Sequence, residues 1–254
     1  MTAGGVFGLI CFVFKTRSNR LERIDTGDYT PEEYERFLRE IRLVNRLAGD
    51  NRALGKTLLR DIENLNPQSF SVLDVGAGSG ELLRAIARFS KRKNKQATLF
   101  GLELNGRSAQ AIREESVNFP EIAAVRGDAF QLPFADDAFD YAICSLFTHH
   151  FTDDDIVRIL GEMSRVARRI YVIDLHRRRA AYFLYQLFCG AFRISPLVRQ
   201  DGSLSILRSF LPGELERLGR AANLENSSVE RVFPFRLILK TERISYEQTR
   251  KFTK

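Results

Sequence analysis

Three glycines alternate where an apolar strand is expected to give way to a helix. Gly76, Gly78 and Gly80 follow the apolar, β-branched run 71–75, which contains Asp74. Glycine tolerates a positive φ and lets a ligand approach the backbone, and a helix N-terminus carries a partial positive charge. The segment therefore predicts a cradle for a polar or anionic ligand.

The spacing of these glycines distinguishes between classes of ligand. A dinucleotide-binding fingerprint runs G-x-G-x-x-G, and its third glycine packs against the strand. This chain runs G-x-G-x-G and has Glu81 at the position of that third glycine. The pattern disfavours a pyrophosphate ligand and leaves open a tight turn that binds nothing.

Polar side chains stand at the ends of the strands that follow. Glu103 ends an apolar segment one strand and helix after Asp74, and Asp128 and Ser145 end two more segments. Ligands of open parallel sheets bind beyond the carboxyl ends of the strands, so these four residues are expected at one edge. A carboxylate there suits a vicinal diol, because its two oxygens accept both O–H donors. The alternatives are a helix-capping role for Glu103 and a Gly-Asp turn for Asp128.

All three histidines of the chain also follow expected strands. His149 and His150 come after the strand 139–145, and His176 comes after the strand 169–175. Imidazole titrates near neutrality and could deprotonate a phenol or an enolic carbon acid. They are therefore candidate general bases, with a structural role for the pair as the alternative.

The elements that must position these residues alternate between strand and helix. Apolar runs bounded by glycine and polar residues predict strands at 71–75, 97–103, 122–126, 139–145 and 169–175, and helices at 79–90, 106–116 and 153–168. Such alternation is typical of a parallel sheet covered on both faces by helices. A further helix is expected at 212–222.

Four motifs in this order resemble those of the class I S-adenosylmethionine-dependent methyltransferases. They are the glycine turn after Asp74, the acid Glu103, the segment Gly127-Asp128-Ala129, and the run from Leu132-Pro133-Phe134 through Phe139-Asp140 and Ser145 to His149-His150. The last motif resembles the small-molecule, type 11 branch that includes enzymes of quinone biosynthesis. Together the motifs span about 70–175.

The resemblance implies a Rossmann-like α/β fold with a seven-stranded, mostly parallel sheet and helices on both faces. It also implies that the apolar stretches 228–233 and 235–240 form a closing antiparallel hairpin. The cofactor would be S-adenosylmethionine, with Glu103 on the ribose hydroxyls and Asp128 on the adenine amine, and no metal is expected. The residues assigned to the cofactor are Asp74, Gly76, Ala77, Gly78, Gly80, Glu103, Leu104, Asp128, Ala129 and Ser145.

The chain divides into an N-terminal tail with a helical cap, 1–66, and a methyltransferase domain, 67–254, with a lid inserted at 176–211. Thr30-Pro31 begins a helix with a threonine cap and a proline at its first position, and Gly49 interrupts it. This region is expected to roof the cofactor. Arg52 or Lys56 would lie near the cofactor's carboxylate, or else be a solvated charge.

The formal net charge of +7 is concentrated in one segment. Eight arginines and a single acid, Asp174, lie between Arg165 and Arg199. The run 180–192 within it is apolar on nearly every helical face, whereas an RNA-binding patch would place aromatics on a polar surface. We interpret the run as a lid over a lipophilic substrate, with a packed core helix as the alternative.

Three lid residues, Tyr182, Tyr185 and Arg177, are expected to contact the substrate, and 203–210 is expected to line the acceptor side. The resemblance implies a polyketide, pyrone or quinone-like acceptor, methylated on oxygen or carbon. Two alternatives stay open, an RNA methyltransferase and a non-catalytic cofactor-binding protein, although no N-P-P-Y type motif follows Cys144-Ser145.

The compartment is expected to be cytoplasmic, with possible peripheral membrane contact. Three widely spaced cysteines, Cys11, Cys144 and Cys189, fit neither a disulfide framework nor a zinc site. The apolar run 6–14 is too short for a span of about 20 residues and lacks the flanks of a signal peptide. It is interpreted as a tail or an interfacial anchor, and nucleic acid is not expected as a partner.

Overall fold

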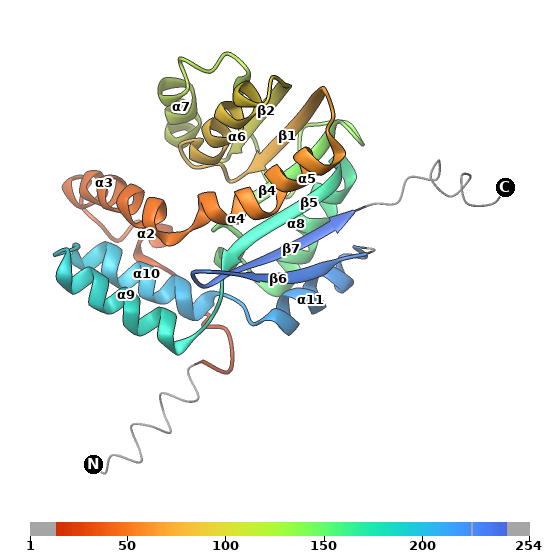
Figure 1. Ribbon diagram of the computed structural model, residues 1–254. Coiled ribbons are helices and arrows are strands. Elements are labelled where there is room, and N and C mark those ends of the chain that lie inside the picture. Colours follow the sequence, from red (N-terminus) through yellow and green to blue (C-terminus); the bar gives the residue numbers. More distant parts are fainter. Residues whose placement is uncertain (1–13, 225, 243–254) are drawn as a thin grey trace, which may run out of the picture.

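The computed structural model, which describes residues 14–224 and 226–242, has a seven-stranded sheet at its centre (Figure 1). The strand order is β3-β2-β1-β4-β5-β7-β6. Strands β1 to β5 pair in parallel, whereas β7 runs antiparallel to both β5 and β6. The bounds are β1 Ser69–Val75, β2 Gln96–Glu103, β3 Ile122–Arg126, β4 Phe139–Ser145, β5 Ala167–Leu175, β6 Ser228–Val232 and β7 Arg236–Glu242. The Rossmann-like sheet and its closing hairpin are thereby confirmed.

Helices cover both faces of this sheet because successive strand residues point to opposite sides. One face packs against α4 (Asp50–Lys56), α5 (Leu58–Leu65) and α6 (Glu81–Arg92). The other face packs against α8 (Asp153–Val166) and α11 (Pro212–Ala221). Helix α7 (Gly106–Glu115) lies beside β2 and β3. Two apolar layers thus hold the strand ends in place.

The glycine turn starts its helix later than the sequence predicts. Gly76, Gly78 and Gly80 have φ values of +72°, +59° and +82°, which is the left-handed region that favours glycine. Gly80 is the residue that precedes the helix, so α6 begins at Glu81 rather than at 79. A second boundary lies earlier than predicted: α8 ends at Val166 instead of 168, because Ala167 is extended and pairs with Phe139.

The N-terminal helices begin and break where capping and glycine indicate. In α3 (Pro31–Ala48) the Thr30 hydroxyl accepts from the Glu33 amide at 3.2 Å, and the Glu33 carboxylate accepts from the Thr30 amide at 2.9 Å. Gly49, with φ +96°, then separates α3 from α4. A short helix before them, α2 (Arg23–Thr26), is not predicted from the sequence.

The segment 176–211, predicted as a lid, contains two helices, α9 (Arg179–Ala191) and α10 (Pro196–Arg208). Cys189, Ile194 and Val198 form a small core that packs against Phe37 and nearby residues of α3. Figure 1 shows α3, α9 and α10 gathered beyond the carboxyl ends of the central strands. None of the helices described is long and apolar enough to cross a membrane.

Candidate active site

A cavity of 370 Å³ lies between the glycine turn and α3. Five of the residues assigned to the cofactor line it, namely Asp74, Gly76, Ala77, Gly78 and Ser145. Its other wall comes from α3 and from the polypeptide just before it, through Ile24, Tyr34, Phe37, Leu38 and Ile41. The N-terminal helices therefore do roof this cavity.

The first two glycines of the turn face different surroundings. A Cβ on Gly76 would lie 2.4 Å from the ring of Phe147, so this glycine is required by the protein's own packing. A Cβ on Gly78 would have no heavy atom within 4 Å. Gly78 thus presents bare backbone to the cavity, which is the arrangement that lets a ligand approach closely.

Glu103 is tied directly to this turn. Its Oε1 accepts from the Gly78 amide at 2.5 Å, and burial raises the pKa of the carboxyl. The next residue, Leu104, is 66% exposed beside it. Glu103 therefore lies beside the glycine turn, as its place at the end of a strand predicts. Its contact with the ribose stays a prediction.

Two buried polar atoms in the cavity wall have no hydrogen-bond partner among the described residues. They are Oδ1 of Asp74 and Oγ of Ser145. Burial, together with the nearby Glu103 charge, raises the pKa of Asp74 to about 8. Because buried polar groups are normally hydrogen-bonded, these two atoms indicate a polar ligand, and a cationic one would stabilise the Asp74 carboxylate. The sulfonium and ammonium groups of S-adenosylmethionine fit that requirement.

Asp128 lies outside the lining of this cavity. It is exposed, and its Oδ1 accepts from the Phe130 amide at 2.9 Å in a turn. Ala129 after it is buried, and Gly80 likewise does not line the cavity. The adenine-binding role of Asp128 therefore remains a prediction.

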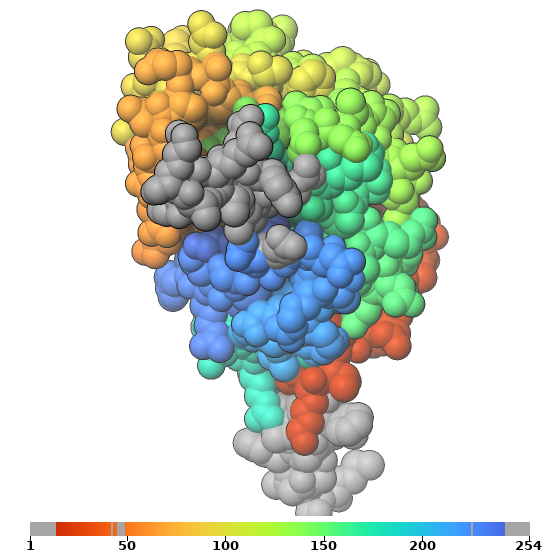
Figure 2. All heavy atoms as spheres, turned by 90° about the vertical axis from the view of Figure 1, so that its right-hand side faces the viewer, coloured from red at the N-terminus to blue at the C-terminus, as the bar shows by residue number. Residues whose placement is uncertain are grey.

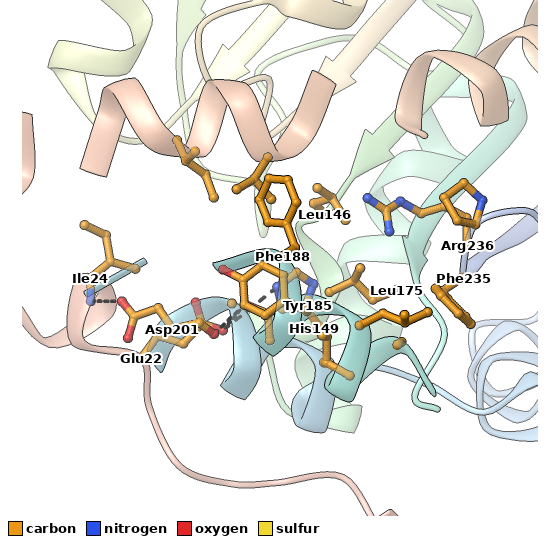
Figure 3. A pocket seen from close by; sticks show the side chains of 18 of the residues that line it. Glu22, Ile24, Leu146, His149, Leu175, Tyr185, Phe188, Asp201, Phe235 and Arg236 are labelled. Carbon is orange, nitrogen blue, oxygen red and sulfur yellow. Dashed lines mark hydrogen bonds and ion pairs between the residues drawn. The ribbon is translucent and has the colours of Figure 1, made fainter. Parts of the chain in front are cut away.

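A second cavity of 400 Å³ adjoins the first and is mostly apolar (Figure 3). The two share Ile24, Phe37, Ile41 and Leu146. The lid helices contribute Leu184, Tyr185, Phe188, Gly202, Ser205 and Ile206. The predicted acceptor segment 203–210 thus reaches the cavity at Ser205 and Ile206.

One end of this second cavity is polar and centres on His149. The His149 ring is 3% exposed, and its Nδ1 lies 2.7 Å from Oδ1 of Asp174. With Nδ1 protonated, the ring donates to this carboxylate and leaves Nε2 as an acceptor. The buried Arg208 donates to the His149 carbonyl at 3.0 Å, which fixes the turn that carries the ring.

Asp174 is an ionised, fully buried carboxylate. Burial alone would raise its pKa, but His149 and the hydroxyl of Thr148, together with backbone amides, hold the pKa near 2. The Thr148 hydroxyl donates at 2.6 Å, the His149 amide at 3.1 Å and the Leu175 amide at 2.7 Å. Asp174 therefore both caps its strand end and orients the ring of His149.

Glu22 faces the same ring and lines the same cavity, although the sequence does not predict it as a residue of the site. Its Oε1 lies 4.0 Å from Nε2 of His149 and accepts from Ser205 at 2.9 Å. Burial raises the pKa of Glu22 to about 7, against the lowering effect of His150. No spacing in the sequence connects Glu22 with the histidines, so no local pattern could have found it.

His150 also lines the second, mostly apolar cavity, which we call the acceptor cavity, and the first cavity is called the cofactor cavity. Nδ1 of His150 lies 3.2 Å from Oδ2 of Asp25. The ligand atoms of Glu22, His149 and His150 all lie within 4.8 Å of one another. These three residues therefore offer a set of groups that could hold a cation, in addition to serving as acids and bases.

The other histidine lies away from both cavities. His176 is 7% exposed and lines neither of them. Burial and the charges of Arg178, Arg231 and Arg177 lower its pKa to about 4. The expectation that His176 serves as a base in the acceptor site is therefore not supported by its position.

Two of the three predicted substrate contacts from the lid also need correction. Arg177 is 1% exposed, and its guanidinium donates to the carbonyls of Phe14, Lys15 and Ser209 and to Glu214. Tyr182 packs edge-on against Phe14 and lies outside the acceptor cavity. Both residues contact the polypeptide before α2; Arg177 is buried there, whereas Tyr182 lines a third cavity of 590 Å³ and not the acceptor cavity.

Tyr185, by contrast, does line the acceptor cavity. Its hydroxyl donates to the Val198 carbonyl at 2.6 Å, so the face of its aromatic ring is the part that lines the cavity.

The two basic residues expected near the carboxylate of the cofactor lie elsewhere. Arg52 lies over the ring of Phe233, and neither Arg52 nor Lys56 lines the cofactor cavity. Asp50 and Asn51 occupy that wall, and Asp50 pairs with Arg236 of the acceptor cavity at 2.6 Å.

The strand order, the glycine turn and the two adjoining cavities define a Rossmann-like domain with a partly polar cavity beside a mostly apolar one. Residues 72–169 match the family model described as Methyltransferase domain. Over this segment the chain is similar to methyltransferases, and its fold is that of S-adenosylmethionine-dependent methyltransferases, whose cofactor is S-adenosylmethionine.

Two such relatives are enzymes of quinone metabolism by name. The 2-phytyl-1,4-naphthoquinone methyltransferase of Thermosynechococcus vestitus is 34% identical over 140 residues, 54% of this chain and 60% of that protein. The ubiquinone/menaquinone biosynthesis C-methyltransferase of Rickettsia prowazekii is 26% identical over 152 residues, 56% of this chain and 59% of that protein. The match thus spans no more than about three fifths of either relative.

Among solved structures, magnesium protoporphyrin IX methyltransferase from Synechocystis with bound SAH aligns with a TM-score of 0.59 at 13% identity. The alignment covers 88% of this chain and all of that one. At this identity the likeness supports the fold alone.

Proposed function

We propose that this chain transfers a methyl group from S-adenosylmethionine to a small, lipophilic, quinone-like or phenolic acceptor. The observation that carries the proposal is the pair of adjoining cavities, one bounded by the glycine turn and the other apolar with the Asp174–His149 pair in its wall. Ile24, Phe37, Ile41 and Leu146 belong to both, so the two ligands would meet across these residues.

S-adenosylmethionine, when bound, supplies an activated methyl group. Its placement would rest on the Gly78 backbone, on the Asp74 carboxylate and on Ser145 Oγ, the groups whose polar atoms lack partners or face open space. Holding donor and acceptor in fixed proximity accounts for a large part of the barrier reduction in reactions of this kind. Helix α3 forms the opposite wall of the cavity and limits access of water.

His149 would act as the general base. Its Nε2 accepts the proton of a phenolic or enolic hydroxyl, while the ionised Asp174 keeps Nδ1 protonated and stabilises the imidazolium that results. Glu22, when ionised, adds a second negative charge 4.0 Å from Nε2. Both O-methylation and methylation at an activated ring carbon require this loss of a proton.

The acceptor class follows from the walls of the second cavity. Its volume of 400 Å³ suits a ring system with a short substituent, and Phe37, Tyr185 and Phe188 supply aromatic surface. Glu22 and Ser205, which line the cavity near His149, would orient a hydroxyl of the acceptor toward the base. The names of the two quinone-metabolism relatives agree with this choice.

The proposal is tested by supplying methyl-labelled S-adenosylmethionine with hydroquinones, hydroxypyrones and polyketide phenols, and by identifying the labelled product by mass spectrometry. Labelled organic-soluble product, lost in His149→Asn, is expected. Label in added RNA, or cofactor binding with no turnover of any acceptor, would instead favour the RNA-modifying or non-catalytic alternatives.

A further inference from the structure

Helix α9 presents apolar side chains to solvent as well as to the protein. Phe183, Leu184 and Leu187 are 54%, 53% and 68% exposed, and Phe192 just after the helix is 57% exposed. Residues 183, 184 and 187 share one helical face by their spacing. A surface helix normally turns polar residues outward, so this face is an unpartnered apolar patch.

The inner face of the same helix lines the acceptor cavity. Ala181, Tyr185 and Phe188 point inward, and Leu184 both lines the cavity and remains half exposed. Helix α9 is therefore the partition between the acceptor cavity and the outside. A lipophilic molecule lying against its outer face would be one side chain away from that cavity.

Exposed arginines flank this face of α9. From 176 to 200 the sequence has five arginines and no acidic residue. Arg178 lies at the start of α9, Arg193 at its end and Arg199 on α10, and all three are exposed. An apolar helical face flanked by arginines is the combination that binds anionic lipid surfaces.

The segment 14–22 contacts the start of α9 and also carries apolar side chains. Phe14 packs against Tyr182 of α9 with ring centroids 5.8 Å apart, and its carbonyl accepts from Arg177. Figures 1 and 2 both show residues 14–22, in red, at the same end of the molecule as the start of α9, remote from α6 and α7. Leu21, in that segment, is 62% exposed. The segment 14–22 therefore begins beside α9, and the apolar sequence 6–13 lies outside the described residues.

We propose that the outer face of α9, with the flanking Arg178 and Arg193, docks on an anionic membrane surface. The helix would lie in the headgroup region with Phe183, Leu187 and Phe192 among the acyl chains. Docking in this way requires only the exposed face and its arginines. Delivery of a membrane-dissolved acceptor past Leu184 is a second consequence, and that part rests on the function proposed above.

The test is co-sedimentation of the full chain with vesicles of phosphatidylcholine, with and without phosphatidylglycerol. Binding is expected only with the anionic lipid. The pair F183S/L187S and the pair R178Q/R193Q should each weaken partitioning by about tenfold or more. None of these four side chains lines either cavity, so S-adenosylmethionine affinity should stay unchanged.

Matched controls come from the opposite end of the molecule. Val117 is 78% exposed beyond α7, and Arg92 and Arg113 are exposed on α6 and α7. V117S and R92Q/R113Q should bind vesicles as the unaltered chain does.

Four results would overturn the proposal, the fourth being failure of the chain without residues 1–13 to bind. One is the absence of binding to phosphatidylglycerol vesicles, and another is equal loss in the control variants. The third is a dimer in light scattering that F183S/L187S converts to monomer, because the face would then be covered by a second copy.

Deleting residues 1–13 distinguishes the contribution of the N-terminal tail from that of α9. The proposal requires that the chain without residues 1–13 still bind vesicles and that R178Q/R193Q still weaken its binding. Vesicle binding is independent of methyl transfer, so failure of the proposed activity leaves this test intact.

Discussion

Oδ1 of Asp174 lies 2.7 Å from Nδ1 of His149. Asp174 stands near the end of β5, and its side chain is fully buried. The contact leaves Nε2 of His149 directed toward the apolar cavity, with Glu22 4.0 Å away. A carboxylate, an imidazole and a second carboxylate thus stand in sequence in the wall of the acceptor cavity, whose described lining also includes Asp201 and Arg236.

Replacing His149 by Asn should lower kcat for an acceptor that must lose a proton by about 10²- to 10⁴-fold, since general-base catalysis contributes that much. The affinity for S-adenosylmethionine should be unchanged, because His149 does not line the cofactor cavity. Steady-state kinetics with calorimetry of cofactor binding checks both. Unaltered kcat in His149→Asn would remove the base from the account, and His150→Asn is the neighbouring control.

Substitutions at the two glycines of the turn should separate folding from binding. Gly76→Ala places a Cβ against Phe147 and should destabilise the fold. Gly78→Ala meets no protein atom, so it should cost only about 1 kcal/mol for its positive φ while weakening cofactor binding strongly. Gly161→Ala, in the exposed part of α8 with open space around it, is the control and should be neutral or stabilising. Equal cofactor affinity in Gly78→Ala and the unaltered chain would contradict the assignment of the cradle.

Binding of S-adenosylmethionine should release a proton at neutral pH. The pKa of Asp74 is raised to about 8, so the carboxyl is largely protonated at pH 7 in the free protein, and a cationic ligand favours its ionised form. Affinity should therefore rise with pH up to about 8 and level off above it. Calorimetry in two buffers with different ionisation enthalpies measures the released proton. Asp74→Asn should abolish the release, and its persistence in that variant would assign it to another group.

Glu22→Gln should remove a pH dependence of stability. The pKa of Glu22 is about 7 in the folded chain against 4.5 for an ordinary glutamate, so the folded state binds the extra proton between these values. The free energy of unfolding therefore falls as pH rises through this window, on the order of 3 kcal/mol in total. Denaturant unfolding of both proteins near pH 5 and above pH 7 gives the difference. A constant difference between them would mean that Glu22 is ionised throughout.

Part of the cofactor-side cavity could be predicted from the sequence because its residues lie at strand ends, whereas Asp128, expected at the same edge, does not line that cavity. The alternating glycines after Asp74 and the acid Glu103 one strand later are read from spacing alone, and the edge of a parallel sheet brings them together.

The acceptor side could not, because its groups come from segments far apart in the chain. Glu22 reaches His149 through the packing of the segment before α2 against α10, which no periodicity encodes. Arg177 sits in an arginine triplet whose sequence suggests a solvated or ligand-binding charge. Its burial follows from four partners on the segments 14–15 and 209–214. Asp174 was visible as a strand-end acid, but its pairing with His149 depends on the three-residue turn that carries the histidines.

The most direct test of the central claim is a single-turnover assay with methyl-labelled S-adenosylmethionine and a panel of hydroquinone and phenol acceptors. It compares the unaltered chain with His149→Asn at saturating cofactor. Label is expected in an organic-soluble product with the unaltered chain, and transfer should be at least about a hundredfold slower in the variant. Transfer at equal rates, or label recovered only in RNA or protein, would contradict it.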